Sequence, residues 1–430
     1  MNPGENKSKD GGQRRYRELV PLVVQKFGGT SVANPDRMRE VADHVARTRR
    51  RGDDVTLVVS AMGKETDELL HMADQISKNP AGREMDMLIT AGERKAVALM
   101  CMALGEMGVE ANSFTGSQAG FLTDTNHRNA KILEITPDRV QAALSNGIVP
   151  VVAGSQGVST DRNVTFLGRG GSDTTAVALA HALDAQWCEL YTDVSGVFTA
   201  DPRVVSAATK MPTISFDELL EMTASGCPKP AMRSVEVAHN YRVPLHVRSA
   251  FTWEPGTLVV ESPVADQEES GMEQPIIRAV THDQSESKLT VLDAPDKPGV
   301  SAILFRALAG ASVNVDMIVQ NTSEEGCTDI SFTVPTEDLD RAEAVIRDGV
   351  VAELGAREVR REASIGKVSV VGAGMKSNPG VAATMFETLA ANDINIGMIS
   401  TSAIRISCVV DTDRTEEAVQ HLHTAFGLDG

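Results

Sequence analysis

The sequence predicts an α/β fold in two parts, a parallel-rich sheet sandwiched by helices followed by two copies of a β-α-β-β module. Three observations support this prediction. The chain has 430 residues, more than one hydrophobic core usually serves. Short apolar runs alternate with helical patterns in its first part, and its last part repeats itself.

The first part extends from residue 21 to about residue 264. Strand-like and helical stretches alternate along it, which is typical of parallel strands joined by crossover helices. The clearest stretches are VTLVVSAM at 55–62, a helical pattern at 85–108, IVPVVAG at 148–154, a helical pattern at 173–183 and CELYTDVSGVFT at 188–199.

The last part contains an internal repeat. Residues 296–318 align with residues 376–399, so that Pro298 matches Pro379 at an offset of 81 residues. Each copy reads as a strand, a Pro-Gly turn, an amphipathic helix and two further strands. Two such copies can together bury surface that neither hides alone. A purely structural duplication without a ligand is the alternative interpretation.

These patterns divide the chain into five segments. The stretch before the first module is polar and acidic around a short IIRAV run, which is typical of a linker leading into an edge strand. We predict a disordered tail at 1–20, the α/β domain at 21–264, a linker at 265–286, the first module at 287–363 and the second module at 364–430.

The composition argues against several classes of protein. A formal net charge of −18, which no Lys/Arg run offsets, opposes binding to nucleic acid. No stretch approaches the ~20 apolar residues that span a bilayer, and the first residues lack the apolar core of a signal peptide. The five cysteines are scattered without C-x-x-C spacing, which disfavours disulfides and zinc. We therefore expect a cytoplasmic protein without a metal-ligand residue.

The first candidate site follows the apolar run at 22–24. There Lys26 precedes the adjacent glycines Gly28 and Gly29, whose backbone N–H groups can approach phosphate oxygens closely. The lysine supplies a positive charge for a phosphoryl group in transfer. The spacing differs from the G-x-x-x-x-G-K-[ST] loop. A tight strand-to-helix turn with a surface lysine is the alternative interpretation.

A second glycine-rich stretch, residues 167–175, precedes the helical run AVALAHAL. Ser172 or Asp173 can cap this helix, and the N–H groups at its start favour an anion. Arg169 can bind a carboxylate through two parallel hydrogen bonds. Because a structural turn would not need the arginine, a binding function is favoured over a turn.

Three further polar stretches lie between these two. In a doubly wound sheet the loops at the carboxyl ends of the strands converge on one crevice, so their combination matters more than any one of them. Each alone is typical of a loop or a solvated helix face. The stretches are Ser60-Ala61-Met62-Gly63 with Thr66, Thr90-Ala91-Gly92-Glu93, and residues 113–120.

Seven motifs follow one another along the chain: KFGGTS, SAMGKETDELL, LITAGER, SFTGSQAGFLTD, VAGSQG, FLGRGGSDTTAVALA and YTDVSGVFTADPR. Their order and spacing resemble the aspartokinases of the amino acid kinase superfamily. The resemblance covers the chain from about residue 22 to its end and is greatest to the actinobacterial type that lysine and threonine regulate. The duplicated tail is similar to ACT modules.

The resemblance implies ATP-dependent phosphorylation of the L-aspartate side-chain carboxylate to 4-phospho-L-aspartate, the first step of lysine, threonine and methionine biosynthesis. Lys26 and Asp173 would be catalytic, with Lys26 stabilising the transferring γ-phosphoryl group. The aspartate pocket would contain Ser60, Thr66, Gly170, Glu93 facing the ammonium group and Arg169 facing a carboxylate. The nucleotide would contact Lys26, Phe27, Gly28, Gly29, Thr192, Asp193, Phe198, Asp201, Arg203 and Lys229.

This set of residues is chemically sufficient for the implied reaction. The acceptor carboxylate is already ionised at neutral pH and needs no general base, so positioning and charge neutralisation carry the catalysis. Mg²⁺ is expected to bind mainly through the phosphates of ATP, and no residue is predicted as a metal ligand.

The similarity to ACT modules implies feedback regulation by lysine, threonine or both. It also implies a homo-oligomer formed through these modules and, as a further partner, a shorter subunit made of the modules alone. Modules of this family can exchange strands, so the predicted boundary at residue 363 concerns the sequence only. The predicted effector contacts are Asp296, Lys297, Pro298, Gly299, Asn314, Val315, Asp316, Gln320, Asn378, Pro379, Gly380 and Val381.

The chain departs from the family pattern at several ligand positions. Ser155 stands where the family carries Phe in Gly-Phe-x-Gly, which removes an aromatic wall from the expected substrate pocket. Pro228 takes the place of a nucleotide-binding lysine, and Ser195 replaces an aspartate. Gly397 and Ala403 stand where acidic residues are common in the effector region. These changes suggest altered specificity or regulation on an intact framework.

Three functions therefore remain as hypotheses. The first is an active aspartokinase, and the second is a specialised kinase for a related amino-acid carboxylate with altered regulation. The third is a non-catalytic amino-acid-sensing subunit. The two kinases are favoured by the retention of Lys26, Glu93, Arg169 and Asp173. The second hypothesis stays open because of Ser155, Pro228 and Ser195.

Overall fold

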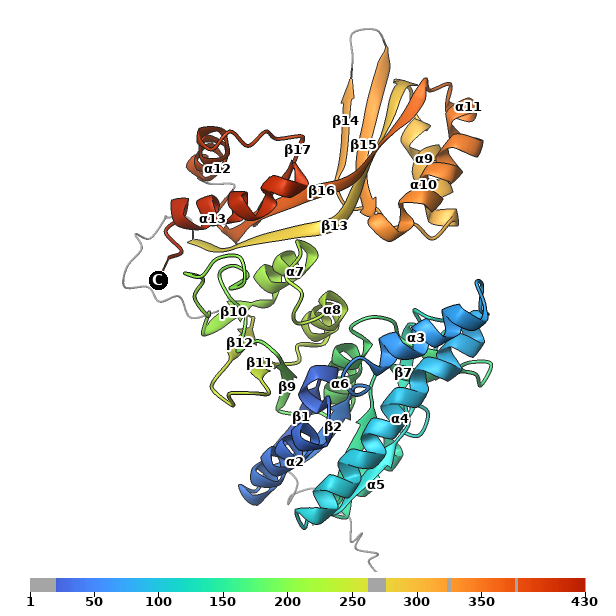
Figure 1. Ribbon diagram of the computed structural model, residues 1–430, viewed down its shortest axis with the longest axis vertical. Helices are drawn as coiled ribbons and strands as arrows, with labels where there is room; N and C mark the ends of the chain where they lie inside the picture. Colours follow the sequence, from blue (N-terminus) through green and yellow to red (C-terminus); the bar gives the residue numbers. More distant parts are fainter. Residues whose placement is uncertain (1–20, 262–275, 323–325, 376–377, 430) are drawn as a thin grey trace, which may run out of the picture. The chain divides into compact units, whose positions relative to one another are not determined.

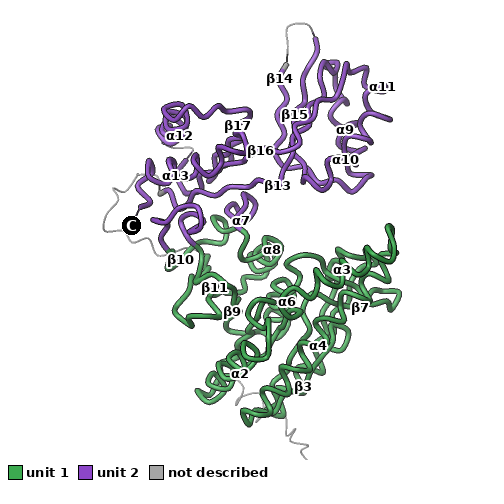
Figure 2. Tube along the Cα trace, in the orientation of Figure 1, with its two compact units in different colours: residues 1–197, 210–220, 228–263 green, residues 198–209, 221–227, 264–430 purple. Residues whose placement is uncertain are grey.

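The computed structural model describes residues 21–261, 276–322, 326–375 and 378–429 (Figure 1). The predicted tail at 1–20 and residues 265–275, half of the predicted linker, lie outside these residues. The chain divides into two compact units (Figure 2). Unit 1 comprises residues 1–197, 210–220 and 228–263, and unit 2 comprises residues 198–209, 221–227 and 264–430.

Unit 1 is built on a large sheet. Its strands are β1 (Leu22–Phe27), β2 (Asp54–Val59), β3 (Ala111–Phe114), β6 (Val149–Ala153), β9 (Trp187–Thr192), β10 (Thr213–Ser215), β11 (Leu245–Ser249) and β12 (Thr257–Val260). They are arranged in the order β10-β12-β11-β9-β1-β2-β6-β3. Neighbouring strands are parallel except for β11 and β12. The predicted parallel-rich sheet is therefore confirmed.

A smaller sheet and several helices complete unit 1. The smaller sheet has the order β5 (Ile132–Ile135), β4 (Phe121–Thr123), β7 (Gln156–Ser159) and β8 (Val164–Phe166). The helices are η1 (Gly29–Val32), α2 (Pro35–Arg50), α3 (Glu65–Ile76), α4 (Gly82–Glu106), α5 (Asp138–Ser145), α6 (Gly171–Ala182) and α8 (Met232–Tyr241), and α7 (Phe216–Ala224) begins in unit 1 and ends in unit 2.

The central strand β1 is buried on both faces, as expected for a strand with parallel neighbours on both sides. Side chains alternate along it. Phe27 packs into the core formed with Val41 of α2 and Met100 of α4. Lys26 points to the opposite face, where its ammonium group meets Asp173 of α6. The alternation of β1 thus places Lys26 on the face opposite this apolar core.

Unit 2 is built on one antiparallel sheet. Its strands are β13 (Ile276–Pro295), β14 (Ile318–Thr322), β15 (Cys327–Pro335), β16 (Glu358–Ala373), β17 (Met398–Thr401) and β18 (Arg405–Val410). Their order is β14-β15-β13-β16-β18-β17. The α-helices are α9 (Val300–Gly310), α10 (Leu339–Val345), α11 (Val351–Leu354), α12 (Gly380–Ala391) and α13 (Thr415–Ala425). Two short 3₁₀ helices, η2 (Thr336–Asp338) and η4 (Thr412–Arg414), and a π-helix, η3 (Ile346–Val350), complete the unit.

The two copies of the repeat share their long strands. Val280 of β13 pairs with Val370 of β16 and packs into the core of the second copy, whereas Val359 of β16 packs into the core of the first. Residues 276–286, which the sequence analysis places in a linker, are therefore part of β13, because pairing with β16 satisfies their backbone groups. The predicted boundary at residue 363 falls inside β16.

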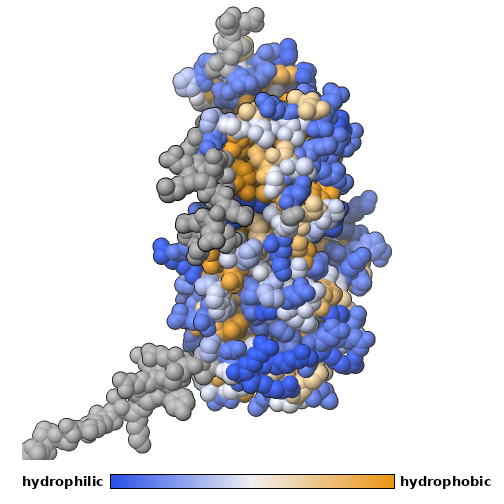
Figure 3. Space-filling model, turned by 90° about the vertical axis from the view of Figure 1, so that its left-hand side faces the viewer, coloured by the Kyte–Doolittle hydropathy of each residue, from blue (hydrophilic) through white to orange (hydrophobic). Residues whose placement is uncertain are grey.

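Hydrophilic residues cover most of the face shown in Figure 3, and hydrophobic residues gather there in smaller patches. This pattern is common, because a folded protein has too little polar surface to cover itself completely. Within the described ranges, no helix combines the length and the apolar character needed to cross a membrane.

Gly256 precedes β12 in a tight connection from β11. A Cβ atom at this position would lie 1.7 Å from the carbonyl oxygen of Val247. We expect Gly256→Ala to lower the melting temperature by roughly 3–10 °C, since an overpacked site costs about 1–3 kcal/mol. Differential scanning calorimetry measures this change.

Gly105 of α4 provides the matched control. A Cβ atom there would meet no atom within 4 Å, and alanine favours a helix by about 1 kcal/mol over glycine. Gly105→Ala should therefore leave the melting temperature unchanged or raise it. Equal melting temperatures for the two variants would contradict the close packing at Gly256.

Candidate active site

The centre of the candidate site is an ion pair between Lys26 and Asp173. The Nζ atom of Lys26 lies 2.6 Å from Oδ1 of Asp173, and each side chain is 7% exposed. The other carboxylate oxygen, Oδ2, accepts a hydrogen bond of 3.1 Å from the N–H of Ala231. The carboxylate therefore joins β1, the first turn of α6 and the residue that precedes α8.

Asp173 is held in its ionised form. Burial by itself would raise the pKa of this carboxyl group, but the charge and hydrogen bond of Lys26 and the N–H of Ala231 outweigh burial and lower the pKa below 3.8. The charge of Lys229 contributes in the same direction. Lys229 is thus near the Lys26–Asp173 ion pair. It directly follows Pro228, one of the positions at which the chain departs from the family pattern.

Two glycines let other chain segments approach Lys26. A Cβ atom on Gly28 would lie 3.3 Å from Nζ of Lys26, and one on Gly29 would lie 2.8 Å from the carbonyl oxygen of Ala61. The N–H of Gly63 donates to the carbonyl oxygen of Gly29 over 3.0 Å. The structure therefore brings the predicted Lys-x-Gly-Gly turn together with the stretch that follows β2.

Glu93 of α4 lies against the same stretch. Its side chain is buried and accepts a hydrogen bond from the N–H of Ala61. Burial, with a smaller contribution from the nearby carboxylate of Glu65, raises the pKa of Glu93 from 4.5 to about 7. Its Oε2 atom has no hydrogen-bond partner among the described residues. A buried carboxyl group in this state is suited to receive a cationic group.

Ser60 directly precedes Ala61 in the chain, and Thr66 follows it five residues later. Ser60 directly follows β2 and Thr66 lies in the first turn of α3, and both are half-buried. Gly92 allows α4 to approach this stretch, since a Cβ atom there would lie 2.9 Å from the Cβ of Ala61. The residues around Ala61 are therefore close to both Gly29 and Glu93.

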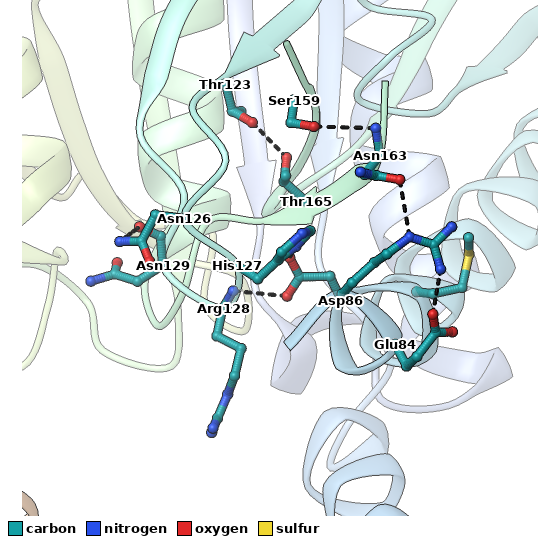
Figure 4. A network of polar contacts seen from close by, with 12 residues as sticks. Glu84, Asp86, Thr123, Asn126, His127, Arg128, Asn129, Ser159, Asn163 and Thr165 are labelled. Atoms are coloured by element: carbon teal, nitrogen blue, oxygen red, sulfur yellow. Dashed lines mark hydrogen bonds and ion pairs between the residues drawn. The ribbon is translucent and has the colours of Figure 1, made fainter. Parts of the chain in front are cut away.

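A polar network links α4 to the loop that contains His127 and Arg128 (Figure 4). Asp86 is fully buried and accepts hydrogen bonds from Nδ1 of His127, at 2.7 Å, and from the N–H of Arg128, at 2.9 Å. The adjacent Asn129 packs against Gly168, whose φ of +89° favours glycine. Asp86 thus fixes the loop 127–129, and this loop contacts Gly168, the residue before Arg169. Arg169 itself is exposed.

Sequence reasoning did not find Asp86 or His127. Their contact joins α4 to a loop 41 residues away, and neither lies in a recognisable motif. Asp86 lies in the predicted helical stretch 85–108, but periodicity alone identifies neither its burial nor its partner.

Ser155 lies at the first turn of α6. Its hydroxyl oxygen is 3.0 Å from that of Ser172, and its N–H donates to Oγ1 of Thr175 over 3.0 Å. Gly171 permits this approach, because a Cβ atom there would lie 2.9 Å from Oγ of Ser155. The family departure at residue 155 is therefore next to the predicted Gly170 and Asp173, with a hydroxyl group in place of an aromatic ring.

The predicted nucleotide residues are divided between the two units. Thr192 ends β9, and its hydroxyl group donates to Oδ1 of Asp193 over 2.9 Å within unit 1. Phe198 lies in the segment 198–209, which belongs to unit 2. In the same segment Asp201 and Arg203 form an ion pair of 2.6 Å, and the hydrogen bond from Arg203 lowers the pKa of Asp201.

The predicted effector residues lie in unit 2, mostly in exposed loops. Asp296, Lys297, Pro298 and Gly299 precede α9, and Asn378 and Pro379 precede Gly380, the first residue of α12. Gln320 of β14 accepts a hydrogen bond of 2.8 Å from the hydroxyl group of Ser301 in α9. The side chain of Asn378 donates to the carbonyl oxygen of Gly374 over 3.0 Å. Val381 is buried in the core of the second copy.

Comparison with known proteins identifies the family. Residues 21–249 match the amino acid kinase family, and residues 293–349 and 368–426 match the ACT domain. The chain is 52% identical over 414 residues to the aspartokinase of Mycolicibacterium smegmatis, which covers 96% of this chain and 97% of that protein. The chain belongs to the aspartokinase family. For the aspartokinase of Corynebacterium glutamicum the identity is 50% with the same coverage.

Solved aspartokinase structures share the fold. The E. coli aspartokinase III complex with aspartate and ADP (R-state) has a TM-score of 0.78 at 26% identity and covers 94% of this chain and 99% of that chain. The aspartate kinase of Synechocystis is 44% identical with a TM-score of 0.53, covering 94% of this chain and 69% of that chain. The predicted aspartokinase resemblance and the fold class are confirmed, and the chain is a phosphotransferase.

The Lys26–Asp173 pair leads to a prediction for catalysis. Asp173→Asn retains an acceptor for the N–H of Ala231 but leaves the buried ammonium group of Lys26 without its counter-charge. We expect kcat for ADP formation to fall by about 10²–10³, the usual effect of losing a preorganised charge in a site. A coupled assay of ADP release measures this loss.

Asp161→Asn is the matched control, because Asp161 is an exposed carboxylate in the same unit. Its kcat should stay within about twofold of the unsubstituted protein, since isolated surface substitutions have small effects. If Asp173→Asn also kept kcat within threefold, while circular dichroism showed it folded, the ion pair would have no catalytic role.

Proposed function

We propose that this protein transfers the γ-phosphoryl group of ATP to the side-chain carboxylate of L-aspartate, forming 4-phospho-L-aspartate at the start of lysine, threonine and methionine biosynthesis. Family membership over almost the whole chain supports this proposal. The observation that carries it is the arrangement in unit 1, where the Lys26–Asp173 pair adjoins the Gly28–Gly29 turn and a buried Glu93 lies near the same turn.

The charges of the site match the charges of the substrates. Lys26 would stabilise the negative charge of the phosphoryl group in transfer, and the absence of side chains at Gly28 and Gly29 would let phosphate oxygens approach the backbone. Glu93 would bind the ammonium group of aspartate, and Arg169 would bind a carboxylate through a bidentate contact. The acceptor carboxylate is ionised at neutral pH, so the reaction needs positioning more than proton transfer.

Mg²⁺ would be bound mainly through the phosphates of ATP. Among the described residues, no group of three or more His, Cys, Asp or Glu side chains is placed to hold a metal ion. An ion that enters with the nucleotide would keep most of its ligands as phosphate oxygens and water. When bound, it would neutralise charge on the β- and γ-phosphates.

Regulation by lysine, threonine or both is the second part of the proposal. The two ACT matches support a sensing role for unit 2. A solved structure of E. coli aspartokinase III holds lysine and aspartate in a T-state, with a TM-score of 0.68 and 26% identity to this chain. Assembly of this protein through its ACT modules, with or without a shorter subunit, and a cytoplasmic location stay predictions.

The alternative functions differ in what they require of the site. A specialised kinase for a related carboxylate is favoured by Ser155, which gives the start of α6 a hydroxyl group where the family has an aromatic ring. A non-catalytic sensing subunit would not need a buried Lys26–Asp173 pair, whose maintenance is costly without a function in charge neutralisation.

The test of the proposed activity is a hydroxylamine trap, which converts an acyl phosphate into a coloured hydroxamate. We expect hydroxamate from L-aspartate and Mg·ATP, none with EDTA, and at least a 10²-fold loss in Lys26→Ala. Lysine and threonine, added separately and together, should suppress the product. ATP consumption with L-glutamate but not with L-aspartate would favour the specialised kinase, and no turnover with either would favour the sensing subunit.

The raised pKa of Glu93 predicts how aspartate binding depends on pH. Only the ionised carboxylate attracts an ammonium group, so kcat/KM for aspartate should rise about tenfold from pH 6 to pH 8, with a midpoint at about 7. Glu93→Gln should raise KM for aspartate and remove this pH dependence. Initial rates across the pH range test both statements.

The same pKa has a consequence for stability. Because the folded pKa of Glu93 exceeds 4.5, its protonated form favours the folded state, and this contribution is lost as pH rises from 4.5 through about 7. Glu106→Gln, at an exposed position of the same helix, is the control. It should leave the dependence of the free energy of unfolding on pH unchanged. If the free energy of unfolding of Glu93→Gln depended on pH as it does in the unsubstituted protein, Glu93 would not contribute to this dependence.

A further inference from the structure

Lys367 lies at the centre of unit 2 with no exposed surface. Its Nζ atom donates hydrogen bonds to Glu286 of β13 and, over 2.8 Å, to Oδ2 of Asp316. Burial alone would lower the pKa of Lys367, but the two carboxylates outweigh burial and raise it. The lysine is therefore a permanent cation that holds two acidic side chains from different segments.

The cluster contains one carboxylate more than its cation can neutralise. Glu286 is buried and its Oε2 atom has no hydrogen-bond partner in the described part of the chain, whereas the side chain of Asp316 is 40% exposed. Asp316 is thus accessible to a second cation from solvent. If it leaves Lys367, the lysine still has Glu286 as a counter-charge and is not left buried and unpaired.

The duplication shows that the exchangeable carboxylate of this cluster belongs to one copy only. At the offset of 81 residues Glu286 matches Lys367, so the two equivalent positions carry opposite charges and pair with each other. Asp316 matches Gly397, which has no side chain to offer. A carboxylate that can exchange its cation therefore exists in the first effector loop and has no equivalent at the matching position of the second.

Lys367 also borders the segment 221–227, which belongs to unit 2. Its Nζ atom lies 3.5 Å from the carbonyl oxygen of Ala224, the long limit of a hydrogen bond. Arg405 of β18 donates to the hydroxyl group of Ser225 over 3.1 Å and lies 3.3 Å from the carboxylate of Glu221. The sheet of unit 2 therefore holds this segment, which continues along the chain into Lys229.

We propose that Lys367 transmits occupation of the first effector loop to the segment 221–227. The ammonium group of an amino-acid effector takes the place of Lys367 on Asp316, Lys367 then pairs with Glu286 alone, and its contact with Ala224 changes. No proton is transferred in this exchange. The inference rests on the regulatory part of the proposed function. It makes Lys367 a positioning residue, which acts through Asp316 and the segment 221–227 and not by contacting a substrate.

Hydrogen–deuterium exchange of the full-length protein, with and without lysine or threonine, tests this role. In the unsubstituted protein we expect the effector to alter exchange in 314–318 and in 221–227. In Lys367→Met the effector should still bind, as measured by calorimetry, but exchange in 221–227 should not respond. The concentration for half inhibition of product formation should rise at least tenfold.

Two further variants exclude a general loss of stability. Glu286→Gln combined with Lys367→Met leaves no uncompensated buried charge, so it should fold if the single variant does not. Lys288→Met removes an ion pair with Glu362 between the same two strands and lies outside the cluster. The double variant should behave like Lys367→Met, and Lys288→Met should keep half inhibition within about twofold of the unsubstituted protein.

The outcomes separate this inference from the proposed regulation. If the Lys367 variants keep both the exchange response in 221–227 and the half-inhibition concentration within twofold, the inference is wrong. If the unsubstituted protein binds neither amino acid, the proposed regulation is wrong. Hydrogen–deuterium exchange of the ligand-free proteins then decides. Faster exchange confined to 221–227 and 314–318, seen in the Lys367 variants but not in Lys288→Met, would support a coupling of these two segments through Lys367. Unchanged exchange, or exchange that is faster throughout the chain, would overturn it.

Discussion

The buried ion pair between Lys26 and Asp173 is the interaction on which the arrangement of unit 1 depends. It joins β1 to α6, segments that are far apart in the sequence, on the side of the sheet opposite the main apolar core. Because a buried charge left without its partner costs about 3–5 kcal/mol, each group requires the other. The second oxygen of Asp173 extends the constraint to Ala231 and so to the start of α8.

Around this pair, two glycines allow neighbouring segments to pack closely because they lack side chains. Gly29 and Gly92 both face Ala61, and a methyl group on either would come within 3 Å of it. These contacts bring the turn after β1 and the helix α4 to the stretch after β2 from two sides. Glu93 is consequently buried and keeps a raised pKa, which ties its chemistry to the packing of two glycines.

Unit 2 shows how a duplicated module becomes asymmetric. Its long strands β13 and β16 each contribute to both cores, so neither copy of the repeat is a separate body. Equivalent positions in the two copies nevertheless carry different charges, as at Glu286 and Lys367. Opposite charges at matching positions favour pairing of the two different copies over pairing of like copies.

The sequence by itself determined the fold class, the duplication and the identity of the motifs, because hydrophobic periodicity and glycine spacing are local properties of the chain. Lys26 and Arg169 were predicted as site residues from the glycine-rich motifs, and the role of Glu93 from the family resemblance of the motifs. Only the tertiary structure decided that β13 includes residues 276–286, that Asp86 supports the loop beside Gly168, and that Lys367 joins Glu286 to Asp316. Those contacts join residues distant in sequence, and their energies depend on burial that no local pattern encodes.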